Sequence, residues 1–174
     1  MVLHVVQVTQ DVARVSVTIA LPFGKASAGE TIATDYWEYE APANWSMDRT
    51  SSPPRSIGPR HELVQLSSQS IPSIHEGENA VAVREKIETA ARELIVQAAT
   101  ESDLRNTKPL TKTVLAPELK VYEIVSESLN GRELLAQFFL VGPHAIVLIT
   151  FEASPTDGSL DDIRRSILRM KWAA

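Results

Sequence analysis

The sequence predicts an α+β fold in which one antiparallel β-sheet is flanked by two main helices, at about residues 78–100 and 160–172. Three observations predict this fold. Strand-like segments lie before and after the long helical segment and do not alternate with helices one by one. Asn130-Gly131 separates two apolar segments and is typical of the turn in a β-hairpin. The last segment begins with Ser and Asp residues, which favour the start of a helix.

The length and composition indicate one soluble domain. A chain of 174 residues with 44% hydrophobic and 22% charged residues can bury one substantial core. Within a single domain of residues 1–174, we expect residues 1–33 to be an extra N-terminal strand segment and residues 34–174 to be the core. The net charge of −5 argues against nucleic acid as a partner, because phosphate contacts need clustered Lys and Arg. The absence of cysteine excludes disulfides, thiolate metal sites and Cys nucleophiles.

The beginning of the chain, "MVLHVVQVTQDVARV", does not resemble a signal peptide. It lacks a basic segment, and polar residues interrupt its apolar run. No stretch approaches the roughly 20 apolar residues that span a bilayer. We therefore expect a cytoplasmic protein without stable membrane insertion.

Three strands are expected in the N-terminal half. Residues 2–21 are rich in Val and alternate with polar residues, which is typical of a half-buried strand. "TIATDYWEYEAP" (31–42) is expected to be a second strand, because its aromatic residues favour a pleated surface. "NWSMDRTSSPPRSIGPR" (44–60) contains three prolines and one glycine, which exclude regular structure for most of its length. "HELVQLSSQSI" (61–71) again has strand character.

Both helices are predicted from apolar residues at spacings of three and four. In the first helix, this stripe is Val83, Ile87, Ala91, Leu94 and Ala98. In the second helix, it is Leu160, Ile163, Ile167 and Met170. Ser159 and Asp162 have the spacing of a capping box at the start of the second helix.

Three strands are expected near the C-terminus: "KVYEIVSESL", "RELLAQFFLV" and "AIVLITFEA". Because successive strand side chains point to opposite faces, the last strand has one uniformly apolar face, which we expect to lie under the helices. That face consists of Ala145, Val147, Ile149 and Phe151. The other face is mixed. It is either covered by the N-terminal strands or the loop, or exposed as a partner-binding patch. The patch would have an apolar centre flanked by two polar side chains: Leu135, Phe139 and Leu148, with Gln137 and Thr150.

No pattern in the sequence predicts a catalytic, metal or cofactor site. The histidines, His4, His61, His75 and His144, are scattered. The aspartates Asp157, Asp161 and Asp162 lack the alternation and final Glu of a calcium loop. Nucleophile-elbow, P-loop and dinucleotide-binding motifs do not occur. Carboxylates that could meet on one sheet face, Glu123, Glu127, Glu133 and Glu152, are interpreted as a solvated face.

The order of these segments resembles a known family. Four features support the resemblance: the Pro42-to-Trp45 pattern with Asp48 following, the Gly131-Arg132 hairpin, the strand at 147–150 and a closing helix. Over roughly residues 36–172, they resemble the PsbP-like (Mog-type) fold, in particular the DcrB-related branch that includes the Eag chaperones of type VI secretion. This chain departs from that branch in the residues before about Thr34. The resemblance implies a non-enzymatic protein that binds other proteins.

The functional hypothesis is therefore a chaperone or adaptor for a type VI secretion effector, which would bind an apolar helix of that effector in a sheet groove. The mixed face is the expected binding surface, and the aromatic segment with Trp37 and Trp45 is a second binding region. The alternative is an immunity protein that neutralises a cognate toxin through an acidic, polar-rimmed surface. A hydrolase with an unrecognised site is a third alternative, since fold does not fix function. A homodimer is left open.

Overall fold

The computed structural model describes residues 29–71, 80–101, 104–106, 108–128, 130–155 and 159–173. The strand expected at residues 2–21 lies outside the described residues, as do His4, His75 and Asp157.

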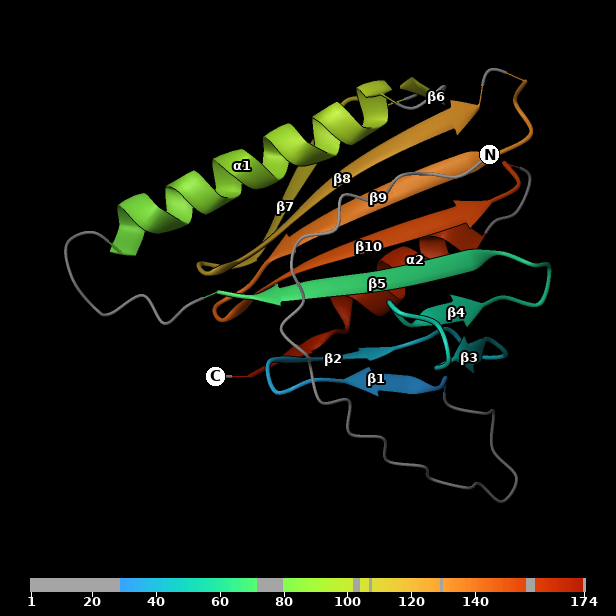
Figure 1. The fold of residues 1–174 in the computed structure, drawn as a ribbon, viewed down its shortest axis with the longest axis horizontal. Coiled ribbons are helices and arrows are strands. Elements are labelled where there is room, and N and C mark those ends of the chain that lie inside the picture. The colour runs from blue at the N-terminus through green and yellow to red at the C-terminus, as the bar shows by residue number, and fades with distance from the viewer. Residues whose placement is uncertain are drawn as a thin grey trace.

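Most strands belong to one antiparallel eight-stranded sheet, which we call the main sheet (Figure 1). Its strands pair in the order β3-β4-β5-β10-β9-β8-β6, and β7 also pairs with β8. Their bounds along the chain are β3 (Ser46–Asp48), β4 (Arg55–Ile57), β5 (Leu63–Ser70), β6 (Leu104–Asn106), β7 (Thr111–Ala116), β8 (Leu119–Ser128), β9 (Leu134–Val141) and β10 (Ala145–Ala153).

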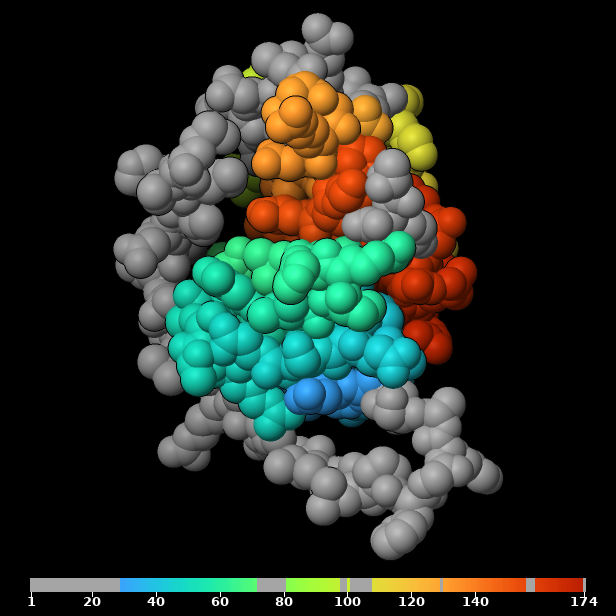
Figure 2. Space-filling view, turned by 90° about the vertical axis from the view of Figure 1, so that its right-hand side faces the viewer, coloured from blue at the N-terminus to red at the C-terminus, as the bar shows by residue number. Residues whose placement is uncertain are grey.

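A second, three-stranded sheet consists of β1 (Thr31–Ala33), β2 (Trp37–Glu40) and β11 (Lys171–Trp172), in the order β1-β2-β11. The helices are α1 (Ala80–Glu101) and α2 (Ser159–Leu168). In Figure 2, the segment from β1 to β5 packs directly against the C-terminal half of the chain. The predicted α+β fold with an antiparallel sheet and two helices is confirmed. None of the described helices is both long enough and apolar enough to cross a membrane.

The two helices lie on opposite faces of the main sheet (Figure 1). The small sheet and α2 cover one face, which we call the α2 face, and α1 packs on the other, the α1 face. The expectation that one strand face lies under both helices is therefore wrong. The central strands β9 and β10 carry apolar side chains on both faces, so each face needs a cover of its own.

The α2 face contains the larger core. Val147, Ile149 and Phe151 are fully buried there and pack with residues of α2 and the small sheet, including Ile163, Ile167 and Tyr39. Trp37 and Trp45 belong to the same core, with exposed fractions of only 4% and 6%. The Trp45 ring lies 6.4 Å from that of Phe151. The prediction that these two tryptophans form a surface for a partner is therefore wrong, because their side chains fill the space between the two sheets.

The segment expected as one strand at residues 31–42 is a hairpin of β1 and β2. Thr34 makes the turn, because its hydroxyl oxygen accepts hydrogen bonds from the backbone N–H groups of Tyr36 and Trp37, both at 3.2 Å. The boundary expected between residues 33 and 34 falls inside this hairpin, so β1 is paired to the core. The segment at 44–60 is also more regular than expected, since it contains β3 and β4, paired with each other.

The β8–β9 hairpin forms where Asn130-Gly131 predicts it. Gly131 has a positive φ, of 64°. The Ser128 N–H donates to the Glu133 carbonyl at 2.9 Å, so the connection is longer than a two-residue turn. The Asn130 side chain stabilises it by accepting a hydrogen bond from the Arg132 N–H at 3.0 Å.

The last helix ends at Leu168, before the expected end near residue 172. Trp172 leaves the helix to pair with Trp37 in the small sheet. Its ring lies so close to Gly142 that a Cβ atom there would come within 2.1 Å of it, which explains the glycine between β9 and β10. The predicted capping box does not form, because the Ser159 hydroxyl has no hydrogen-bond partner among the described residues.

Two hydroxyl groups are buried where α2 packs on β2 and have no well-oriented hydrogen-bond partner among the described residues. They belong to Tyr39 and Ser166, which lie close enough for the Ser166 hydroxyl to lower the Tyr39 pKa but not in good hydrogen-bonding geometry. Burial raises the pKa of the Tyr39 phenol, and the nearby Ser166 hydroxyl and Arg169 only partly offset this. An unsatisfied buried hydroxyl destabilises the folded state by about 1–3 kcal/mol.

Removing the unsatisfied Tyr39 hydroxyl should therefore not destabilise the protein. We expect Tyr39→Phe to melt at the same temperature as the parent or above it. The matched control is Tyr122→Phe, because the Tyr122 hydroxyl donates to Glu88 at 2.9 Å and its loss should lower the melting temperature. Thermal melts followed by circular dichroism compare the two variants. A lower melting temperature for Tyr39→Phe would show that its hydroxyl is hydrogen-bonded in solution.

A charge in the core of the α2 face should abolish cooperative folding. We expect this of Ile149→Asp, because an unpaired buried carboxylate adds a cost of several kcal/mol to the lost packing. Leu168→Asp is the control, since Leu168 is 54% exposed on α2. The measurement is the urea unfolding transition. A cooperative transition for Ile149→Asp near the parent midpoint would contradict the assignment of this face to the core.

Candidate functional site

The mixed face predicted from the C-terminal strands is the α1 face of the main sheet. Helix α1 contacts β6, β8 and β9 on this face. Beneath it lies a second apolar cluster, made of Ala91, Ile95, Tyr122, Ile124, Phe139 and Val141. The half of the face that lies over β8 and β9 is thus covered by the protein's own chain. The cover is α1, which is neither of the covers considered from the sequence, the N-terminal strands or the loop, and this half of the face is not an exposed patch.

The buried stripe of α1 is narrower than the predicted one. Ala91 and Ile95 are buried and Ile87 packs beside them, but Leu94 is 56% exposed and Val83 is 38% exposed. Successive residues of an α-helix are rotated by about 100° around its axis. Val83 and Leu94 therefore lie on one side of the buried stripe, and Glu88 lies on the other. Because Glu88 faces β7 and β8, this apolar flank faces the β10 side of the sheet.

A charged cluster holds the other flank of α1 to the sheet. The Glu88 carboxylate accepts a hydrogen bond from the Tyr122 hydroxyl at 2.9 Å and forms an ion pair with Lys120. Lys112 of β7 adds a second ammonium group 3.6 Å from the carboxylate, and this group lies 5.5 Å from the centre of the Tyr122 ring. These residues are up to 34 positions apart in sequence, so no local pattern predicts the cluster.

The charges in this cluster shift two pKa values in opposite directions. Burial alone would raise the pKa of Glu88. Hydrogen bonds from Lys120 and Tyr122, together with the charges of Lys120 and Lys112, outweigh that effect and hold the pKa below its usual value. Burial and the neighbouring Glu88 carboxylate raise the pKa of Tyr122 to about 12. At neutral pH, Glu88 is therefore a charged carboxylate and Tyr122 a neutral phenol, which are the forms that favour their contact.

The half of the α1 face beyond β9 remains partly accessible. We call it the β5–β10 strip, and it consists of Ile146, Leu148 and Thr150 of β10 and of Gln65, Ser67 and Gln69, which are their partners on β5. The three β10 side chains and Gln65 are half-buried, and Ser67 and Gln69 are exposed. Ile146 and Leu148 also contact the cluster beneath α1. The strip is therefore an apolar row bordered by uncharged polar side chains.

The structure brings the five predicted residues of the mixed face together. Leu148 lies opposite Phe139, and Thr150 lies opposite Gln137, on neighbouring strands. Leu135, Gln137 and Phe139 are each only 8% exposed, whereas Leu148 and Thr150 are half-buried. Phe139 thus belongs to the core under α1, and the accessible part of the predicted patch is on β10. The side-chain oxygen of Gln137 is buried and has no hydrogen-bond partner among the described residues.

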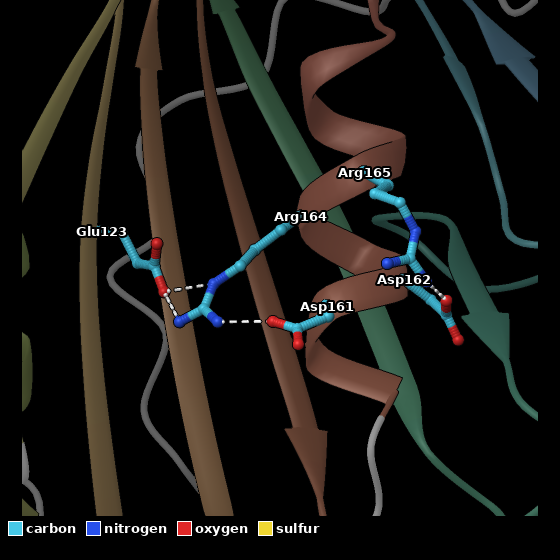
Figure 3. Close-up of polar contacts among 5 residues, drawn as sticks. All are labelled: Glu123, Asp161, Asp162, Arg164 and Arg165. Carbon is cyan, nitrogen blue, oxygen red and sulfur yellow. Dashed lines mark hydrogen bonds and ion pairs between the residues drawn. The ribbon is translucent and has the colours of Figure 1, made fainter.

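The carboxylates Glu123 and Glu152, which on the sequence alone could share one sheet face, do not form a common site. Glu123 points from β8 toward α2, where it accepts two hydrogen bonds from Arg164, at 2.5 and 3.0 Å (Figure 3). Arg164 also binds Asp161 at 2.7 Å, and Arg165 pairs with Asp162 on the other side of the helix (Figure 3). Glu152 lies on the opposite face of the sheet from Glu123. In the parts of the chain that the structure describes, no three His, Asp or Glu side chains gather to hold a metal ion.

Comparisons with known proteins identify the fold and no closer relationship. No family model matches the chain, and a search of curated proteins finds no match. Among solved structures, the chain is similar to the solution structure of cyanobacterial PsbP (CyanoP) from Synechocystis sp. PCC 6803. The TM-score is 0.56 at 12% sequence identity, and the match covers 90% of this chain and 98% of that chain. The chain therefore has a PsbP-like fold.

The Glu88 cluster predicts a pH dependence of stability. The folded-state pKa of Glu88 lies below its unfolded value of about 4.3, so its contribution is fully present above that value and is lost as the pH falls through the folded pKa. We expect Glu88→Gln to melt below the parent at pH 7, and the difference to shrink at pH values under about 4. Glu85→Gln, at an exposed position of the same helix, is the control and should not change the melting temperature at pH 7. A difference between parent and Glu88→Gln that stays constant with pH would contradict the assigned ion pair.

Proposed function

We propose that this protein is a non-catalytic binding module that receives an apolar segment of another protein on the β5–β10 strip. The observation that carries the proposal is the partial cover of the α1 face. Its β8–β9 half is packed under α1, while Ile146 and Leu148 remain accessible beside it. Half-buried Ile and Leu side chains next to a buried cluster offer a partner a surface that is already shaped by the core.

The neighbouring flank of α1 supports a helical partner. Val83 and Leu94 are exposed on the side of α1 that faces β10. A helix lying along β10 would contact this flank on one side and the strip below it, which is the arrangement of an amphipathic helix in a groove. Gln65, Ser67 and Gln69 would border the bound helix and stay partly in water.

The specific role that we propose is that of a chaperone or adaptor for a secreted effector. A chaperone must shield an apolar segment from water before that segment reaches its destination, and the uncharged strip suits this task. The resemblance to the branch with the Eag chaperones points to an effector of type VI secretion. The similarity to CyanoP supports the fold alone and does not name a partner.

Leu148 offers the most direct test of the binding surface. Phe139 is less suitable, because it packs under α1 and its replacement would disturb the core. We expect a synthetic Leu/Ala-rich helical peptide of about 20 residues, the length of an apolar membrane span, to bind the parent protein. Leu148→Gln should weaken this binding roughly tenfold or more, since a buried Leu contributes about 1.5–3 kcal/mol. Fluorescence anisotropy of a labelled peptide measures the dissociation constant.

Leu168→Gln is the matched control, because Leu168 is an exposed Leu on α2, on the other side of the main sheet. It should bind the peptide as the parent does. Equal weakening by both variants would indicate non-specific apolar adsorption. No effect of Leu148→Gln, in a protein with an unchanged melting temperature, would place binding elsewhere.

A further inference from the structure

We propose that Asn130 and Gly131, in the connection between β8 and β9, form a site of spontaneous covalent modification, at which the side-chain amide of Asn130 is converted to a carboxyl group. The inference does not depend on the proposed binding function. It is carried by the exposure of Asn130, by the open space around Gly131 and by the hydrogen bonds that hold the Asn130 side chain.

The Asn130 side chain is held over the peptide bond that joins it to Gly131. Its Oδ1 atom accepts a hydrogen bond from the Arg132 N–H at 3.0 Å, which closes an Asx turn over Gly131. This turn folds the side-chain amide carbon back toward the Gly131 nitrogen, which is the atom that adds to it. Gly131 has a positive φ, and no other part of the protein lies within 4 Å of the place where a Cβ atom would be. Asn130 is exposed, so water reaches the amide.

Two donors converge on the Asn130 Oδ1 atom. The Ser128 hydroxyl donates to it at 2.6 Å, beside the Arg132 N–H. The Ser128 oxygen itself accepts a hydrogen bond from the Glu133 N–H at 3.0 Å, which polarises the hydroxyl and strengthens its donation. When a nitrogen adds to an amide carbon, negative charge develops on the amide oxygen, and donors already aimed at that oxygen stabilise the charge. The turn therefore assists addition to the Asn130 amide.

The reaction needs no reactant other than water. The Gly131 nitrogen loses its proton to solvent and forms a bond to the Asn130 side-chain carbon. The bond from that carbon to the side-chain nitrogen then breaks, and this nitrogen takes up a proton and leaves as ammonia. Water opens the resulting succinimide ring at one of its two carbonyl groups, which gives aspartate or isoaspartate. In the folded protein the Gly131 N–H donates to the Ser128 carbonyl at 2.8 Å, and this bond must open first, so the reaction is slow.

The two products fit the turn differently. Aspartate keeps an acceptor oxygen in the position of Oδ1, and its charge strengthens the hydrogen bonds from Ser128 and Arg132. Isoaspartate carries the main chain through the former side-chain carbon, which lengthens the connection between β8 and β9 and moves the acceptor away. The turn therefore retains its hydrogen bonds in the first product and loses them in the second.

Mass spectrometry of the purified full-length protein, incubated at neutral pH in water enriched in ¹⁸O, tests the inference. Tryptic peptide 121–132 should incorporate ¹⁸O at Asn130 and contain isoaspartate, which enzymatic carboxyl methylation detects. Asn44 is the internal control, because it is also exposed with a positive φ, of 69°, but the buried Trp45 follows it. Peptide 26–49, which contains Asn44, should not incorporate ¹⁸O. An unmodified Asn130, or equal modification of the two asparagines, would overturn the inference.

Two variants of Ser128 test the role of the hydrogen-bond donors. Ser128→Ala removes the hydroxyl that donates to Asn130, and it should slow the modification several-fold. Ser128→Thr keeps a hydroxyl and should react at the rate of the parent. The measured quantity is the rate of ¹⁸O incorporation into peptide 121–132, and circular dichroism checks that each variant stays folded during the incubation. A rate for Ser128→Ala that equals or exceeds that of the parent would contradict assistance by the turn.

Discussion

The pairing of β9 with β10 is the constraint on which the rest of the structure depends. In this register, Val147 lies opposite Leu140 on one face of the sheet, and Leu148 lies opposite Phe139 on the other. Both pairs are apolar, so neither face can be left to water over its whole width. The fold must supply two covering layers, and the chain provides them from different places: α2 with the small sheet on one side, and α1 on the other.

The two covers differ in completeness. On the α2 face, the small sheet and α2 bury a wide core that reaches from β5 to β8, and Arg164 ties α2 to Glu123 at its margin. The fit is close enough that the hydroxyls of Tyr39 and Ser166 are buried without a well-oriented hydrogen-bond partner in the described part of the chain. A face buried in this way exposes few apolar side chains to a binding partner. The tryptophans of this region are therefore part of the core.

On the α1 face, the cover is one helix with a narrow buried stripe. Ala91 is small, so α1 can lie close to β8 and β9, and Glu88 on one flank of the helix contacts Lys112 of β7 and Tyr122 of β8. The cost of this placement is that Leu94 remains in water and that β10 lies beyond the edge of the helix. A helix held over one side of the sheet by a carboxylate therefore creates the accessible strip beside it. Structure and proposed function are linked at this point, because the interactions that dock α1 also determine how much of the sheet a partner can reach.

The sequence by itself determined the features that depend on local periodicity and turn chemistry. The alternation in 145–153 gave the two faces of β10, the spacing in 78–100 gave α1, and Gly131 marked the hairpin, because each of these signals is contained in a few neighbouring residues. Only the tertiary structure decided which layer covers each face, because an apolar stripe does not identify the surface that buries it. It also decided that Trp172 pairs with Trp37, 135 positions away, and that Glu88 meets Lys120 and Tyr122. These contacts join residues that are distant in the chain, and their energies depend on the packing of whole layers.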